Sequence, residues 1–236
     1  MLYKFFPITV FLIMAFTTSN VKNPEKSKLM AVASKTSFEV NADVVYGSLN
    51  ANHFALPKLE SFSEALKGFY ELKEKGLVEK DILTLIDFSL SSNTKRLWVI
   101  DLSTNTILYN TLVAHGRNTG EEFATSFSND VSSYKSSLGF YTTGEVYNGK
   151  HGLSLKLDGL EKGVNDRARA RAVVMHGADY VSDSFISNNE RLGRSLGCPA
   201  IPEEFKKEII QTIKNKSCLF IYHPSRNHVK MDKLSA

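Results

Sequence analysis

The central part of the chain alternates between apolar and polar positions in short runs, which is the pattern of β-strands. Residues 96–102 and 106–114 are two such runs joined by three polar residues, so they predict a β-hairpin. Residues 139–146 and 152–157 predict a second hairpin, whose turn is expected at Asn148-Gly149 because this pair favours a type I′ turn. Together these runs predict a mainly β fold.

Two further strands are expected closer to the C-terminus. Residues 167–175 alternate arginine with apolar side chains, so a strand here would place Arg167, Arg169 and Arg171 on one face. That strand would run directly into His176-Gly177. Residues 217–222 are almost continuously apolar, which is typical of a buried strand.

Segments with the apolar spacing of helices occur before and after these β runs in the sequence. Apolar residues recur three and four positions apart from Leu59 to Leu72, and a second short helix is expected near residues 79–85. Residues 58–86 are therefore interpreted as a helical hairpin packed on the β body at residues 94–223. A last helix is expected after Pro202, with an apolar stripe made of Phe205, Ile209, Ile210 and Ile213.

The first residues have the pattern of an export signal. Lys4 precedes a short apolar stretch that small polar residues follow, so residues 1–19 are interpreted as a signal peptide. A transmembrane helix needs about 20 apolar residues, so no stable membrane insertion is expected after cleavage. Residues 20–57 are interpreted as a poorly structured lead-in, and residues 58–236 as a single catalytic domain. The protein is expected to be exported to the periplasm or cell envelope.

Composition and charge exclude several classes of protein. The 236 residues are 42% hydrophobic and 23% charged, an ordinary globular composition that is neither disordered nor fibrous. The formal net charge of +4 is small, and no basic block alternates with aromatic residues, so a nucleic-acid partner is not expected.

Two short segments could carry chemistry: His176-Gly177, and the run Ser195-Leu196-Gly197-Cys198 before the expected last helix. A cysteine directly upstream of a helix N-terminus would have its thiolate favoured by the helix dipole. A histidine within hydrogen-bond reach would act as general base and later protonate a leaving amine. The amides of Gly197 and Cys198 could then stabilise a developing oxyanion.

A His-Gly pair upstream of Ser-Leu-Gly-Cys resembles the L,D-transpeptidase (YkuD-type) catalytic domain, specifically a divergent murein L,D-transpeptidase branch. The resemblance implies a YkuD-like β-sandwich with a few peripheral helices, no metal and no other cofactor. It also implies that Cys198 is the nucleophile and His176 the base, framed by Ser195 and Gly197. The implied substrates are peptidoglycan stem peptides, whose acyl group would pass through a Cys thioester to an acceptor amine.

The residues after Cys198 depart from the family's usual pattern, which often has an Arg or Asn shortly after the cysteine. Pro199-Ala200 stands there instead, so the substrate carboxylate must be recognised elsewhere. Arg194 is the first candidate because it adjoins the Ser-Leu-Gly-Cys turn. The other proposed substrate-binding residues are Arg169, His115, His151 and Gly177. The polar segment at residues 116–137 exceeds the usual loop length and is considered as a lid over a groove.

Several other hypotheses remain open at this stage. Water in place of the amine would make the protein an L,D-carboxypeptidase or endopeptidase. The exported chain contains only two cysteines, Cys198 and Cys218, which allows a structural disulfide and a non-catalytic wall-binding module. The histidines also allow a zinc-dependent cell-wall peptidase, although no spacing nominates three ligands.

Overall fold

The computed structural model describes residues 41–226, and within this range no helix is long and apolar enough to cross a membrane. The expected signal peptide at residues 1–19 lies outside the described residues. Residues 41–57, expected to be poorly structured, instead begin with a helix at 41–47, and Tyr46 and Phe54 pack against a hydrophobic core. This expectation was wrong because the few aromatic side chains of the segment find partners only in the folded protein, and the Trp98 indole also donates a 2.7 Å hydrogen bond to the Ala55 carbonyl.

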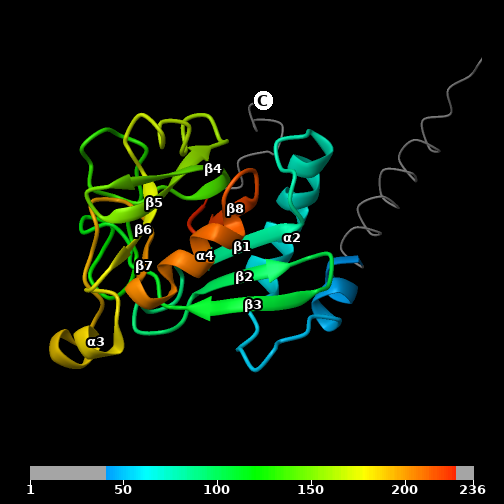
Figure 1. Ribbon diagram of the computed structural model, residues 1–236, viewed down its shortest axis with the longest axis horizontal. Helices are drawn as coiled ribbons and strands as arrows, with labels where there is room; N and C mark the ends of the chain where they lie inside the picture. The colour runs from blue at the N-terminus through cyan, green and yellow to red at the C-terminus, as the bar shows by residue number, and fades with distance from the viewer. Residues whose placement is uncertain (1–40, 227–236) are drawn as a thin grey trace, which may run out of the picture. The chain divides into compact units, whose positions relative to one another are not determined.

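Eight strands form one mixed sheet in the order β3-β2-β1-β8-β4-β5-β6-β7 (Figure 1). Neighbouring strands are antiparallel except for the pairs β1–β8 and β6–β7. The strands are β1 (Ile82–Asp87), β2 (Leu97–Asp101), β3 (Thr106–Thr111), β4 (Gly139–Gly149), β5 (Gly152–Gly159), β6 (Val174–Ala178), β7 (Ala200–Pro202) and β8 (Cys218–Tyr222).

The main hydrophobic core lies between two halves of this sheet. Ile86 and Val99, from β1 and β2, belong to the same buried cluster as Leu155 from β5 and Met175 from β6. Just after β3, the amide of Ala114 donates a 2.8 Å hydrogen bond to the carbonyl of Ala200 in β7, so the two edges of the sheet meet. The predicted mainly β fold, with sandwich-like packing and a few peripheral helices, is confirmed.

The helix α2 (Leu59–Glu74) packs against β1 and β8 through its apolar stripe and confirms the first predicted helix. The second helix expected at residues 79–85 was wrong, because β1 occupies most of this range. β1 lies between β2 and β8, and both of its faces are covered, so its apolar run is nearly continuous and lacks the alternation of a half-exposed strand. The expected helical hairpin at residues 58–86 is therefore one helix followed by a central strand.

Both predicted β-hairpins are present, as β2–β3 and β4–β5. The turn of the second was misplaced by two residues. Gly149 pairs with Gly152, so Lys150 and His151 form the turn, and Asn148 lies within β4. This register carries His151 to the tip of the hairpin.

The strand expected at residues 167–175 was also wrong for most of its length. Residues 161–173 form successive turns with local hydrogen bonds, such as 2.9 Å from the amide of Val173 to the carbonyl of Ala168, and the ladder begins only at Val174. The helix α3 (Asp183–Asn189) then lies on the crossover to β7. The last predicted helix is confirmed as the 3₁₀ turn η1 (Glu203–Phe205) continuing into α4 (Lys206–Ile213), and β8 follows as predicted.

Candidate active site

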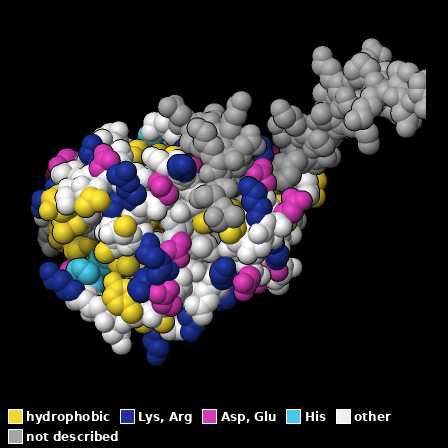
Figure 2. Space-filling model, turned by 90° about the horizontal axis from the view of Figure 1, so that it is seen from above, with side chains coloured by type: hydrophobic (Ala, Val, Ile, Leu, Met, Phe, Trp, Pro, Cys, Tyr) yellow, Lys and Arg dark blue, Asp and Glu magenta, His cyan; other side chains and the backbone are white. Residues whose placement is uncertain are grey.

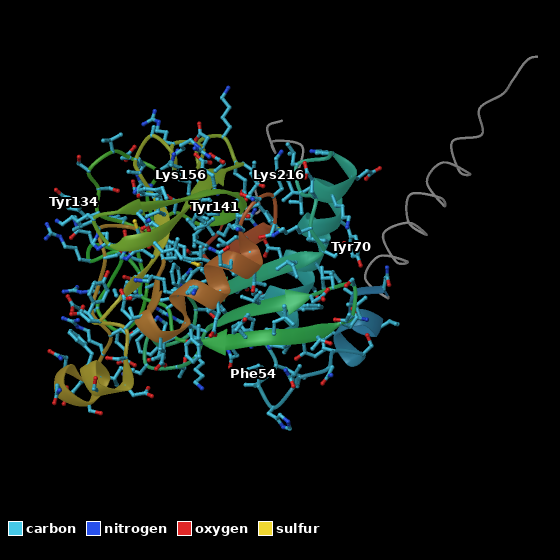
Figure 3. All side chains as sticks on the ribbon, in the orientation of Figure 1. Phe54, Tyr70, Tyr134, Tyr141, Lys156 and Lys216 are labelled. Carbon is cyan, nitrogen blue, oxygen red and sulfur yellow. The ribbon has the colours of Figure 1, made fainter. Side chains whose placement is uncertain are left out.

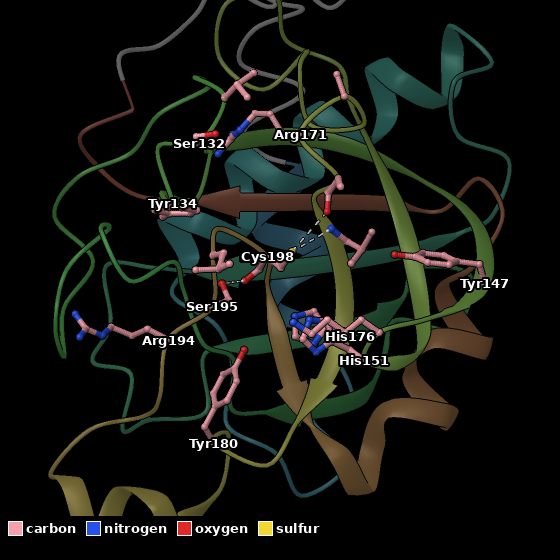
Figure 4. A pocket seen from close by; sticks show the side chains of 16 residues that line it. Ser132, Tyr134, Tyr147, His151, Arg171, His176, Tyr180, Arg194, Ser195 and Cys198 are labelled. Atoms are coloured by element: carbon pink, nitrogen blue, oxygen red, sulfur yellow. Dashed lines mark hydrogen bonds between the residues drawn. The ribbon is translucent and has the colours of Figure 1, made fainter.

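Pairing of β6 with β7 brings His176 and Cys198 to one cavity of about 540 Å³ (Figure 4). The two strands are parallel and pair His176 with Ala200, so Cys198 lies level with Val174. Side chains two positions apart in a strand share a face, and both Val174 and His176 line the cavity while Met175 points into the core. The register thus closes the 22-residue gap between the two segments.

A tight turn holds the cysteine. The Ser195 hydroxyl donates a 2.6 Å hydrogen bond to the carbonyl of Cys198 and accepts one of 3.0 Å from the amide of Gly197. The amide of Ser195 donates to the carbonyl of His115 at 3.0 Å, which fastens the turn to the segment after β3. Ser195 therefore shapes the backbone around Cys198, and its hydroxyl is fully used in doing so.

Gly197 is the one residue of this turn that must lack a side chain. Its φ of 121° belongs to a region that residues with a Cβ rarely adopt. A Cβ atom there would lie 2.9 Å from the backbone oxygen of Lys135. The turn and the loop over the cavity consequently pack backbone against backbone.

The helix-dipole argument for a preformed thiolate is wrong. β7 follows Cys198, and the first helical turn begins only at Glu203. Burial raises the pKa of the Cys198 thiol, while a weak hydrogen bond from the amide of Val174 and the charge of Arg171 act in the opposite direction. The sulfur lies 3.8 Å from the carbonyl oxygen of Ala172, an acceptor for the thiol proton. The resting form is accordingly the thiol.

A backbone contact fixes the tautomer of His176. Its Nδ1 lies 2.8 Å from the carbonyl oxygen of Gly177, which can only accept, so Nδ1 carries the proton and Nε2 has a free lone pair. Burial lowers the pKa of His176, and the nearby His151 and Lys206 act in the same direction, while the hydrogen bond to the Gly177 carbonyl and the charge of Glu203 act against them. The neutral imidazole is therefore the resting form, matching the neutral thiol.

His151 stacks on His176, with ring centroids 4.2 Å apart and planes inclined by 18°. The exposed ring of His151 comes from the tip of the β4–β5 hairpin and covers the buried ring of His176 (Figure 4). Through this contact His151 shields the base from solvent and restricts its orientation.

Of the two amides expected to stabilise an oxyanion, one is already bound. The expected pair was Gly197 and Cys198, but the amide of Gly197 is bound to the Ser195 hydroxyl. Within residues 41–226 the amide of Cys198 donates to no acceptor. Of the expected pair, the Cys198 amide is thus the donor that remains available.

Hydrogen bonds to Arg171 hold the polar segment at residues 116–137, the possible lid, in place. The two terminal nitrogens of the Arg171 guanidinium donate four hydrogen bonds to this segment. The acceptors are the carbonyl oxygens of Ser128 (2.9 Å) and Lys135 (2.7 Å) and the hydroxyls of Ser133 (3.2 Å) and Ser137 (2.5 Å). Val131, Ser132 and Tyr134 of the same segment line the cavity. Arg171 therefore holds one wall of the cavity against the strand that carries His176.

Replacing Arg171 with glutamine is expected to loosen this wall. Hydrogen bonds to a charged donor contribute about 1.5–3 kcal/mol each, so losing several should speed amide exchange in residues 126–137 by roughly tenfold or more. Hydrogen–deuterium exchange followed by mass spectrometry measures this directly. Arg167→Gln is the matched control, since the Arg167 side chain is exposed and its one ion pair among residues 41–226 is a 3.8 Å contact with Asp130. Equal exchange in the two variants would contradict the role of Arg171.

The other predicted substrate-binding residues are only partly gathered at the cavity. Arg194 lines it, but its guanidinium is paired with Glu121 at 2.5 Å. His115 is buried, and its Nδ1 lies 2.8 Å from Nη2 of Arg96. Burial lowers the pKa of His115 to about 4. Arg169 points away and pairs with Glu145 and Asp158. Gly177 faces Glu203 and Lys206 and contributes its carbonyl to His176.

Three tyrosines and a lysine of the cavity were missed from the sequence. Tyr134, Tyr147 and Tyr180 line it, and so does Lys150. Tyr147 and Lys150 were placed incorrectly because the hairpin turn was misassigned, and Tyr134 and Tyr180 lie in loops whose path has no periodic signal. Arg171 is expected from the sequence on an exposed strand face, as a further candidate for carboxylate recognition, whereas the structure uses it to hold the loop over the cavity.

The two structural alternatives find no support in the described residues. Cys198 and Cys218 are both free thiols, and Cys218 lies fully buried in the second hydrophobic core beneath α2. Among residues 41–226, no three His, Cys, Asp or Glu side chains converge as a metal site would require. The disulfide hypothesis is therefore contradicted by the arrangement of the cysteines.

Comparison with known proteins gives one family. The family model described as the L,D-transpeptidase catalytic domain (YkuD_2) matches residues 56–222, which is more than half of the chain. A search of curated proteins returns no match.

Solved structures of low similarity were also found. An L,D-transpeptidase from Mycobacterium smegmatis is 10% identical with a TM-score of 0.37, over 61% of this chain and 59% of that one. The helical cell shape determining protein Pgp2 from Campylobacter jejuni is 13% identical with a TM-score of 0.41, over 70% of this chain and 58% of that one. The chain thus spans less than two thirds of the length of these solved structures.

Proposed function

The chain belongs to the L,D-transpeptidase catalytic domain family, and from this premise we propose that it is a cysteine-dependent acyltransferase acting on peptidoglycan stem peptides. The single observation that carries the proposal is the cavity shared by Cys198 and His176, in which a thiol and an imidazole base face the same space. Ser195 and Gly197 form the turn that presents the thiol. No step of this chemistry requires a metal or an organic cofactor.

The proposed first half-reaction acylates the enzyme. Nε2 of His176 accepts the thiol proton as Sγ of Cys198 attacks the carbonyl carbon of the donor peptide bond. The amide of Cys198 donates to the resulting oxyanion. When the intermediate collapses, the C–N bond breaks and the imidazolium protonates the departing amine, leaving a Cys198 thioester and neutral His176.

The second half-reaction reverses these steps with a new nucleophile. An acceptor amine attacks the thioester carbonyl, gives its proton to His176, and leaves with the acyl group as the Cys198 thiol is reprotonated. Water in place of the amine would give an L,D-carboxypeptidase or endopeptidase. We propose the amine as the main acceptor, on the family membership, and export to the periplasm or cell envelope, on the signal-like residues 1–19.

Product analysis tests this proposal. Purified protein is incubated with disaccharide-tetrapeptide fragments of peptidoglycan, with and without a free amino acid amine in excess, and the products are resolved by mass spectrometry. We expect loss of the terminal residue together with its replacement by the added amine. Loss without exchange would establish hydrolysis instead, and unchanged fragments would contradict the proposed activity.

A further inference from the structure

The cavity differs in charge from the surface around it. Basic and acidic side chains are interspersed over the face seen in Figure 2, consistent with a net charge of only +4. The cavity lining, in contrast, contains Lys150, Arg171 and Arg194 and two histidines, and no Asp or Glu among the described residues that form it. Such a one-sign lining favours an anionic ligand and disfavours a cationic one.

Two of these three cations already have partners. The Arg171 guanidinium donates four hydrogen bonds to residues 128–137 of the loop over the cavity. Arg194 is ion-paired with Glu121 and also contacts the carbonyl of Arg117 at 3.0 Å. The Arg171 guanidinium cannot bind a ligand carboxylate in bidentate fashion without giving up these contacts, and the charge of Arg194 is already balanced by Glu121.

Lys150 is different. Its ammonium makes no hydrogen bond or ion pair within residues 41–226, although six other lysines of this range form ion pairs or reach an oxygen. The β4–β5 turn places it next to His151, which stacks on the base His176. Lys150 thus lines the cavity next in sequence to the residue that stacks on His176, and its ammonium has no partner among the described residues.

We propose that Lys150 is the carboxylate-binding residue of this cavity and makes the enzyme selective for acyl donors with a free carboxylate near the scissile bond. The inference rests on the proposed function for the identity of the donor. It assigns to the hairpin tip the recognition that Arg194 and Arg169 were expected to provide. A carboxamide in place of the carboxylate leaves the ammonium without its counter-charge, so the neutral donor binds less well.

Alkylation of Cys198, which needs no peptide substrate, tests whether Lys150 attracts an anion to the cavity. Rates of alkylation of Cys198 by iodoacetate and by iodoacetamide, reagents of similar size that differ in charge, are measured by mass spectrometry and normalised to N-acetylcysteine. We expect the wild-type ratio to favour the anionic reagent and Lys150→Gln to lower this ratio by about three- to fivefold. Lys156→Gln is the matched control, since Lys156 lies on β5 (Figure 3), pairs with Glu145 at 2.7 Å and is not among the residues that line the cavity.

A pair of donor peptides that differ only in carboxylate or carboxamide tests the selectivity. We expect Lys150→Gln to lower kcat/KM for the carboxylate peptide by about fivefold and to leave the amide peptide nearly unchanged. Equal ratios in Lys150→Gln and Lys156→Gln, for reagents and peptides alike, would overturn the proposal. If neither peptide reacts but the reagent ratio falls as expected, the transpeptidase proposal fails while the anion site stands. If both peptides react without a Lys150-dependent preference, the transpeptidase proposal stands and the assignment of Lys150 fails.

Discussion

Replacing Cys198 with alanine is expected to abolish both covalent labelling and turnover. Wild-type protein incubated with a carbapenem should gain the mass of one opened β-lactam, because such compounds are expected to acylate the family's cysteine. Cys198→Ala should gain none and should lose turnover of peptidoglycan fragments by about a thousandfold or more, since no other nucleophile replaces the thiol. Intact-protein mass spectrometry provides the first measurement and product analysis the second.

The second cysteine supplies the control for this experiment. Cys218 is fully buried in β8, where burial raises its pKa, so it is an inert thiol. Cys218→Ala should retain labelling and turnover, with a modest loss of stability from the small cavity it creates. Labelling of Cys198→Ala at any other residue would remove Cys198 from the mechanism.

Replacing His176 with glutamine is expected to lower the acylation rate by about 10²–10⁴-fold, the usual contribution of a general base. The neutral resting state is the reason: burial raises the pKa of Cys198 and lowers that of His176, so no thiolate–imidazolium pair is preformed. The proton must therefore be removed during attack. Glutamine can still donate to the Gly177 carbonyl, so the backbone arrangement should be preserved. His53→Gln, at an exposed position outside the cavity, is the control.

The pH profile separates a base from a merely structural histidine. The active form of His176 is the neutral imidazole, so the rate should fall as the pH drops through its pKa, and this acidic limb should lie below the ordinary histidine value of about 6.5. In His176→Gln the limb should disappear. Direct alkylation of Cys198 by iodoacetamide should rise only at alkaline pH, above the ordinary thiol value of about 8.5. A thiolate already present at neutral pH would contradict this mechanism.

Local periodicity in the sequence was enough for much of the fold. The helix α2 and the hairpin β2–β3 follow from spacing that repeats within a few residues, as do α4 and β8. The pair of segments around His176 and Cys198 was likewise recognisable, because residue type and short spacing carry that signal. Each of these features has a signal that lies within a few neighbouring residues of the sequence, although β8 pairs with the distant strands β1 and β4.

The tertiary structure decided what depends on distant contacts. The apolar run of β1 lacks the alternation of a half-exposed strand because a hydrophobic core covers each of its faces, and residues 167–173 alternate like a strand but close into turns through local hydrogen bonds. Parallel pairing of β6 with β7 brings the base to the nucleophile, and burial without a helix N-terminus reverses the expected pKa of Cys198. The observed hairpin turn lies two residues later than the predicted one, which places Lys150 at the cavity. Register and burial belong to the whole fold, because they are set by partners that no single segment contains.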